Sequence, residues 1–190
     1  MQISDAEPGQ GAPKEDWFST HPFSPLRVRA LKLFDESEFA KKGGTKALDL
    51  EMGVQGLMSL MEPSYLEGRT KTAEAMRRLL LAGAMVIADA HDGIGEQEIA
   101  MFEKFFGKGS FSDELDIEAL QRELPNRIEQ VKETATTPQA MQVLRDLCIV
   151  ARAEGSIEEP ERALLDKIAD GLDIARGFVC TTLDNNLEPD

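Results

Sequence analysis

The chain has 190 residues, of which 42% are apolar but only 6% aromatic, so one domain with an aliphatic and methionine core is expected. Its 35 acidic and 21 basic side chains give a formal net charge of −14. So acidic a surface repels a phosphate backbone, and we expect no nucleic acid partner. The longest apolar run, residues 79–88, is about half of what a bilayer crossing needs, so no direct membrane span is predicted.

The first sixteen residues are rich in glycine, proline and acids and show no periodicity, so residues 1–16 are predicted to be a disordered linker. The next segment, residues 17–42, opens on an aromatic pair. In it, Ser24 is a candidate N-cap and Pro25 a candidate first helical residue. The predicted helix runs to about residue 42 and ends at Gly43 and Gly44.

Residues 45–185 show helical periodicity throughout, and no segment alternates like a strand. Thr45 is a candidate cap for a helix whose core stripe comprises Leu50, Val54, Leu57, Met58 and Met61. Further helices are predicted over residues 72–90, 96–106, 116–134, 137–151, 158–169 and 174–183, the third of them open to interruption at Pro125. The predicted fold is an all-α compact bundle of about seven helices. Cys148 and Cys180 have no close cysteine partner and are expected to be reduced and buried, as in a cytoplasmic protein.

An internal repeat lies within this region. Shifting the chain by 63 residues aligns residues 80–106 with residues 143–169 without a gap, and eight of the 27 positions are identical. Chance would give about two identities, so we infer a duplication. Each copy is a buried helix, an acidic turn with glycine, and an amphipathic helix with a Glu in its first turn, which makes two helix-turn-helix repeats.

The turn of each repeat has a structural interpretation. Gly93 and Gly155 allow the left-handed backbone conformation that commonly follows a helix end. Glu98 and Glu161 stand at the third position of a capping box, where a carboxylate accepts from free N–H groups. Helix capping therefore explains most of the motif.

The functional alternative for these turns is a cation site. Four acidic side chains would converge as oxygen ligands for calcium or magnesium: Asp92, Glu98, Glu154 and Glu161. An EF-hand loop is excluded, because Ala88, Ala90 and Ile99 stand where acidic ligands are required. Such a site would therefore have to be assembled across the two repeats.

The two copies, ADAHDGIGEQE followed by MFEKFF and ARAEGSIEEPE followed by LLDKIA, resemble the TerB-like family of tellurite-resistance-associated domains over about residues 45–185. The resemblance implies an all-helical domain with two helix-turn-helix halves. It also implies an accessory role in stress-response or membrane-associated bacterial systems, an acidic cation-binding patch and no established reaction. The copies place their acids one residue differently, and the second has Glu154 in place of the Asp of the first.

The segment WFSTHPFSPLR, residues 17–27, resembles the last conserved block of HtpX-type zinc metallopeptidases, which include the CAAX prenyl proteases. His21 and Arg27 have the spacing of that block. The resemblance implies that His21 steadies an oxyanion, that Arg27 pairs with an active-site carboxylate, and that residues 17–42 are the tail of a peptidase domain. Alternatively, His21 and Pro22 form a turn into a helix with Arg27 and Arg29 on its solvated face.

The chain alone lacks the zinc site of such a peptidase. Its only histidines are His21 and His91, and neither lies in an H-E-x-x-H motif. The leading hypothesis is an accessory interaction or regulatory module, the C-terminal part of a membrane-associated zinc metallopeptidase and tethered to the membrane through it. Its partner would be the upstream peptidase domain or another protein. The alternatives are a divalent-cation-binding stress-response domain without a peptidase link, and a chain that contributes His21 and Arg27 to an upstream zinc site.

Overall fold

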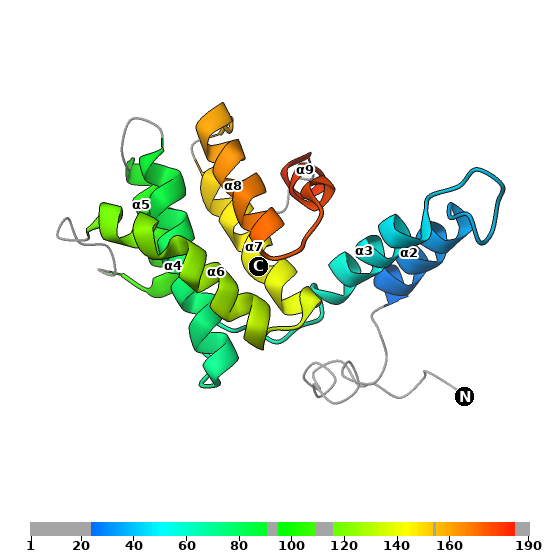
Figure 1. Cartoon of the computed structure of the whole chain (residues 1–190), viewed down its shortest axis with the longest axis horizontal. Helices are drawn as coiled ribbons and strands as arrows, with labels where there is room; N and C mark the ends of the chain where they lie inside the picture. The colour runs from blue at the N-terminus through cyan, green and yellow to red at the C-terminus, as the bar shows by residue number, and fades with distance from the viewer. Residues whose placement is uncertain (1–23, 91–94, 109–115, 154, 185–190) are drawn as a thin grey trace, which may run out of the picture.

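A computed structural model describes residues 24–90, 95–108, 116–153 and 155–184. Within these ranges the chain forms eight helices and no strand, which confirms the predicted all-α bundle (Figure 1). The helices are α2 (Ser24–Asp35), α3 (Ala47–Met58), α4 (Lys71–Asp89), α5 (Glu96–Phe106), α6 (Ile117–Thr134), α7 (Thr137–Ala151), α8 (Glu159–Gly171) and α9 (Arg176–Asp184). None of these helices combines the length and the apolar character that a bilayer-spanning segment needs.

The first helices of the two repeats, α4 and α7, lie at the centre of the bundle and pack against each other. The apolar run of α4 is buried as predicted, and Leu79, Leu80 and Ile87 have no exposed surface. A Cβ atom at Gly83 would lie 2.8 Å from Cδ2 of Leu147. The glycine therefore lets α7 approach α4 closely.

Two bundle helices, α4 and α6, begin close to their predicted starts, and a polar side chain caps each of them. Thr70 accepts from the N–H of Ala73 at 3.1 Å, and Asp116 accepts from the N–H of Ala119 at 2.9 Å. Helix α6 continues through Pro125. Its buried face packs against the core, and this packing outweighs the local cost of proline.

The predicted end of the first helix is wrong. Helix α2 ends at Asp35, about seven residues before the predicted boundary. The reason lies at Ser37, whose N–H and hydroxyl both donate to the carbonyl of Phe34, at 3.0 and 2.6 Å. A serine that satisfies the last carbonyls in this way ends the helix before Gly43 is reached.

The predicted cap of the second helix is also wrong. Thr45 lies in the turn, where its carbonyl accepts from the N–H of Glu38 at 2.8 Å. The carboxylate of Glu38 then accepts from the N–H of Ala47 at 3.0 Å, so a residue nine positions away caps α3. A Cβ atom at Gly44 would collide with the backbone of Ser37, which is why the turn requires glycine there.

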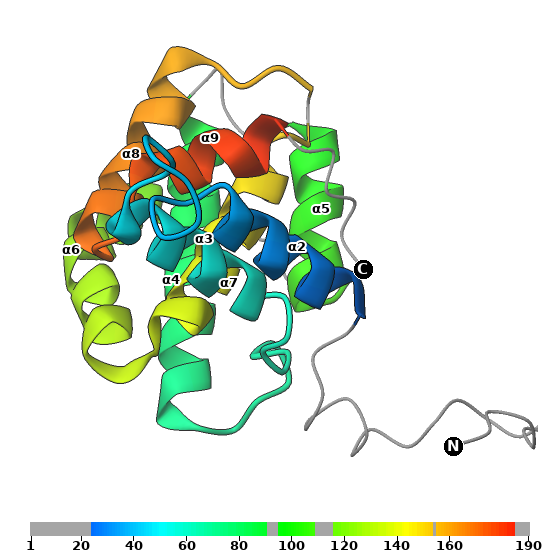
Figure 2. The same cartoon turned by 90° about the vertical axis from the view of Figure 1, so that its right-hand side faces the viewer.

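Helices α2 and α3 form an antiparallel arm, residues 24–61, beside the bundle (Figures 1 and 2). The predicted core stripe of α3 is therefore wrong. No residue of α3 is buried, and Met58 and Met61 are exposed. Among the described helices, α2, α7 and α9 are the main neighbours of α3, and much of its apolar surface stays outside the core.

The two cysteines differ in environment. Both are free, and Cys148 is buried as predicted. Cys180 is exposed, which corrects the expectation for that residue, and its sulfur lies 2.6 Å from Nη2 of Arg162. The short helix α9 presents only Val179 and Thr182 to the interior, so Cys180 falls on its outer face.

Candidate functional site

The residues that resemble the peptidase block are not brought together with an acidic partner among the described residues. His21 lies outside the described residues. Arg27 stands in the first turn of α2, is exposed, and forms no ion pair with another described residue. Its proposed pairing with a carboxylate therefore remains a prediction.

The acidic residues of the repeat turns are only partly described. Asp92, Glu154 and the side chain of Glu98 lie outside the described residues. Glu161 is buried in the first turn of α8, and its carboxylate accepts from the N–H of Glu158 at 2.8 Å, which confirms its capping role. Gly155 has a φ of 110°, as the turn was predicted to require. Within the described ranges, no three His, Cys, Asp or Glu side chains are grouped to hold a metal ion.

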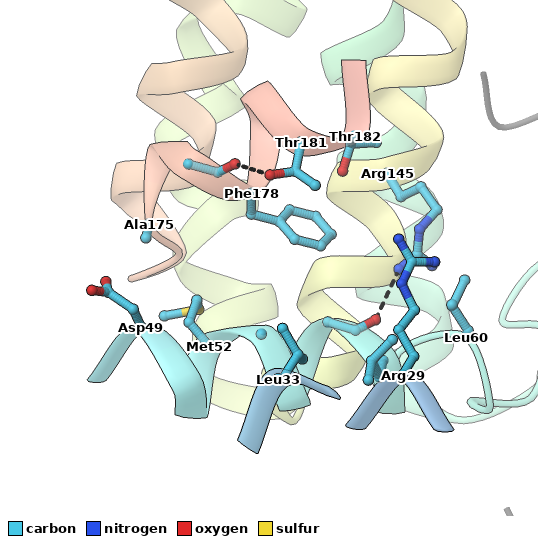
Figure 3. Close-up of a pocket in the computed structure, with 14 residues that line it drawn as sticks. Arg29, Leu33, Asp49, Met52, Leu60, Arg145, Ala175, Phe178, Thr181 and Thr182 are labelled. Atoms are coloured by element: carbon cyan, nitrogen blue, oxygen red, sulfur yellow. Dashed lines mark hydrogen bonds between the residues drawn. The ribbon is translucent and has the colours of Figure 1, made fainter. Parts of the chain in front are cut away.

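A pocket of about 550 Å³ lies between the arm and the bundle (Figure 3). Helices α2 and α3 form one wall, and α7 and α9 form the other. The residues that line it are Arg29, Leu33, Asp49, Met52, Gly53, Gly56, Leu57, Leu60, Arg145, Ala175, Gly177, Phe178, Thr181 and Thr182. Sequence patterns do not reveal this site, because its lining combines the α2 and α3 segment with residues of α7 and α9 more than 80 positions later in the chain.

Two glycines of α3 keep the pocket open. A Cβ atom at Gly53 would lie 3.2 Å from Cδ1 of Leu33, and one at Gly56 would lie 3.4 Å from Cε2 of Phe178. Larger side chains at these two positions would fill the space between α3 and its neighbours. Their spacing of three residues places both on one face of the helix, which was the available signal in the sequence.

Arg145 reaches from α7 to the C-terminal end of α3. Its Nη2 group donates to the carbonyl of Gly56 at 3.3 Å and to the hydroxyl of Ser59, which is itself buried. The guanidinium lies 5.8 Å from the centre of the Phe178 ring, within the range of a cation–π contact. Carbonyls at a helix C-terminus attract a cation, so Arg145 holds the arm against the bundle.

The guanidinium of Arg145 forms no direct ion pair with a carboxylate among the described residues. Burial lowers the pKa of the guanidinium, although nearby Asp146 and Cys148 act in the opposite direction. Asp146 instead accepts from the hydroxyl of Tyr65 at 2.6 Å, and burial raises the pKa of Asp146 to about 6. Since an arginine stays protonated, the pocket wall carries a partly buried positive charge.

Two more charged residues line the pocket, at different ends. Arg29, on α2, is exposed and lies at the same end as Arg145 (Figure 3). Asp49, in the first turn of α3, is exposed at the opposite end. The pocket is therefore positive at one end, in a chain whose net charge is −14.

The lining offers binding groups rather than reactive ones. Its described residues are arginine, threonine, glycine, the single aspartate Asp49 and apolar side chains, and none of them is a histidine or a cysteine. Cys148 lies near Arg145, yet burial raises the pKa of its thiol to about 12, so the nucleophilic thiolate is not formed near neutral pH.

Comparison with known protein families, curated proteins and solved structures finds no match to this chain. The geometry and chemistry of the pocket are thus what bears on function.

Proposed function

We propose that this chain is an interaction module that holds a partner protein, and that its partner is a zinc metallopeptidase domain. The observation that carries the proposal is an apolar stripe on the outer face of α2. We call Val28, Leu31 and Phe34 the α2 stripe, and they are 66%, 69% and 51% exposed. Their spacing of three residues places them in one row along the helix.

The α2 stripe continues beyond the helix. The ring of Phe34 stacks on that of Phe39, with ring centres 6.5 Å apart, and Phe39 is exposed as well. Leu33 is half-buried and faces Gly53 of α3, so the helix has one apolar face toward α3 and a second toward solvent. A contiguous exposed apolar patch of this kind is typical of a protein-binding surface.

The arm also differs in charge from the rest of the chain. Residues 24–46 contain six basic and three acidic side chains, whereas residues 47–190 contain 28 acidic and 14 basic ones. Arg27 and Lys32 flank the α2 stripe on the helix surface. The complementary partner surface would be apolar with an acidic rim.

The link to a peptidase rests on the position of the α2 stripe in the sequence. Helix α2 lies inside residues 17–42, the segment that resembles the tail of an HtpX-type peptidase. If that segment belongs to a peptidase domain, the α2 stripe is the face that would pack on it. Residues 45–185 would then be a TerB-like accessory domain, and the peptidase domain would hold the zinc.

A site-specific photo-crosslinker in place of Leu31 tests this proposal in the producing cells. Gln121, exposed on α6, is the matched control position on the bundle. We expect position 31, but not position 121, to crosslink to a polypeptide or domain with an H-E-x-x-H zinc motif, identified by mass spectrometry. Equal crosslinking from both positions, or none to such a domain from position 31, would contradict the proposal.

A further inference from the structure

We propose that the pocket between the arm and the bundle binds a terminal carboxylate carried on an apolar body, with Arg145 and Arg29 holding the carboxylate. This site uses other residues than the α2 stripe. It therefore stands independently of the proposed peptidase link. Its ligand class follows from three features of the pocket wall.

The first feature is the unused hydrogen-bonding capacity of Arg145. Only its Nη2 group donates to other described residues, so Nε and Nη1 remain open to a ligand in the pocket. Asp146 acts on the guanidinium through space but accepts no hydrogen bond from it, so a bound carboxylate would supply a direct anionic contact and the missing acceptors. Arg29 at the same end of the pocket adds a second positive charge.

The second feature is the hydroxyl of Thr182. This side chain is only 5% exposed and lines the pocket, and its oxygen points into the pocket in Figure 3. It makes no hydrogen bond with another described residue. The hydroxyl oxygen is not one of the sealed, unpaired polar atoms among the described residues, so it is reached from the pocket and offers a ligand a further polar contact.

The third feature is the apolar remainder of the lining. The pocket is also lined by the apolar side chains of Leu33, Met52, Leu57, Leu60 and Phe178. Its volume of about 550 Å³ lies in the range of small-molecule sites. The carboxylate of Asp49 at the far end would repel a second negative charge. The pocket thus suits a ligand with a single anionic end, either a fatty acid or the apolar C-terminal residue of a peptide.

Calorimetric titration of the full chain distinguishes a fatty acid from a peptide C-terminus as the source of the carboxylate. One series of titrations uses decanoate, with decanol and decylamine as analogues of equal length. A second series uses an acetylated tripeptide that ends in a free leucine carboxylate, with its C-terminal amide as the analogue. We expect at least one carboxylate to bind with one-to-one saturation and its neutral analogue to bind about tenfold more weakly or worse. Equal binding of acid and neutral analogue, or no saturable binding of either acid, would overturn the proposal.

Substitutions then locate the site. Arg29→Gln should weaken binding of the carboxylate about tenfold, whereas Lys32→Gln, one turn further along α2 and outside the pocket lining, should leave it unchanged. Arg145→Gln should abolish binding, but it also removes the link between α7 and α3. The Gly177→Leu substitution avoids that difficulty.

Gly177 lines the pocket and a Cβ atom there meets no heavy atom within 4 Å, so a leucine has room to narrow the pocket without disturbing the fold. We expect Gly177→Leu to keep the wild-type circular dichroism spectrum and melting temperature and to lose carboxylate binding. A folded Gly177→Leu protein that binds as the wild type does would refute the pocket as the site. Crosslinking from position 31 should be unaffected by this change, so the two proposals can fail separately.

Discussion

The bundle and the arm are built from helices of similar apolar content but hold together in different ways. In the bundle, α4 and α7 bury most of their apolar side chains. In the arm, no apolar side chain from Leu26 to Met58 is buried, and the buried residues are Ser37 and, just after α3, Ser59. Packing therefore stabilises the bundle, whereas turn hydrogen bonds and the contact with Arg145 position the arm. The apolar surface of the arm stays available to a partner.

The largest effect is expected where packing dominates. Leu147 has no exposed surface and contacts Gly83 across the α4–α7 interface. Leu147→Ala should lower the free energy of unfolding by about 2–5 kcal/mol, because it removes buried methyl groups and leaves a cavity. Urea unfolding followed by circular dichroism measures this change. A loss of less than about 1 kcal/mol would mean that the bundle core is looser than its burial indicates.

The next effect is a pH dependence from Asp146, a partly buried carboxylate in the bundle next to Arg145. Burial raises the pKa of Asp146 from its ordinary value of 3.8 to about 6. Between these values the folded chain binds more protons than the unfolded chain. The contribution of Asp146 to stability is therefore fully present below about pH 4 and is lost as the pH rises through about 6, with a total of about 1–3 kcal/mol.

Asp146→Asn isolates this contribution from the other carboxylates. The unfolding free energies of the wild type and the variant are measured at pH 4, 5, 6 and 7. The wild type should lose stability relative to the variant as the pH rises through this window. Tyr65→Phe should raise the pKa of Asp146 further, because the Tyr65 hydroxyl favours the ionised form. A pH-independent difference between wild type and Asp146→Asn would contradict the assignment.

The difference between the two regions also explains what the sequence could predict. Helix starts in the bundle were predictable, because local caps such as Thr70 and Asp116 determine them. The burial of α3 was predicted wrongly, because periodicity shows which residues share a face but not whether another element covers it. The pocket could not be predicted at all, since Arg29, Arg145 and Thr182 meet only in the folded chain. The capping role of Glu161 was predictable because it acts within one helical turn.

A smaller and local effect is expected in the turn of the arm. Gly44→Ala would place a methyl group against the backbone of Ser37, so the turn between α2 and α3 could not close as it does. Hydrogen exchange should become faster over residues 26–58 but stay unchanged over residues 71–89. The global free energy of unfolding should change by less than about 1 kcal/mol.

Gly177→Ala is the control for this experiment, since a methyl group there has open space. It should leave exchange in the arm unchanged. If Gly44→Ala instead accelerated exchange in α4 as well, the arm and the bundle would unfold as one unit, and the contrast between the two regions would be wrong.

The smallest effect on stability is expected for Leu31→Ala, the same chemical change as Leu147→Ala at the α2 stripe. Leu31 is 69% exposed, so its truncation should alter the free energy of unfolding by no more than about 0.5 kcal/mol. A loss above about 2 kcal/mol would mean that another surface covers the stripe in solution. Repeating the unfolding at several protein concentrations would then show whether a second copy of the chain provides that surface, because only a self-associated stripe makes the loss depend on concentration.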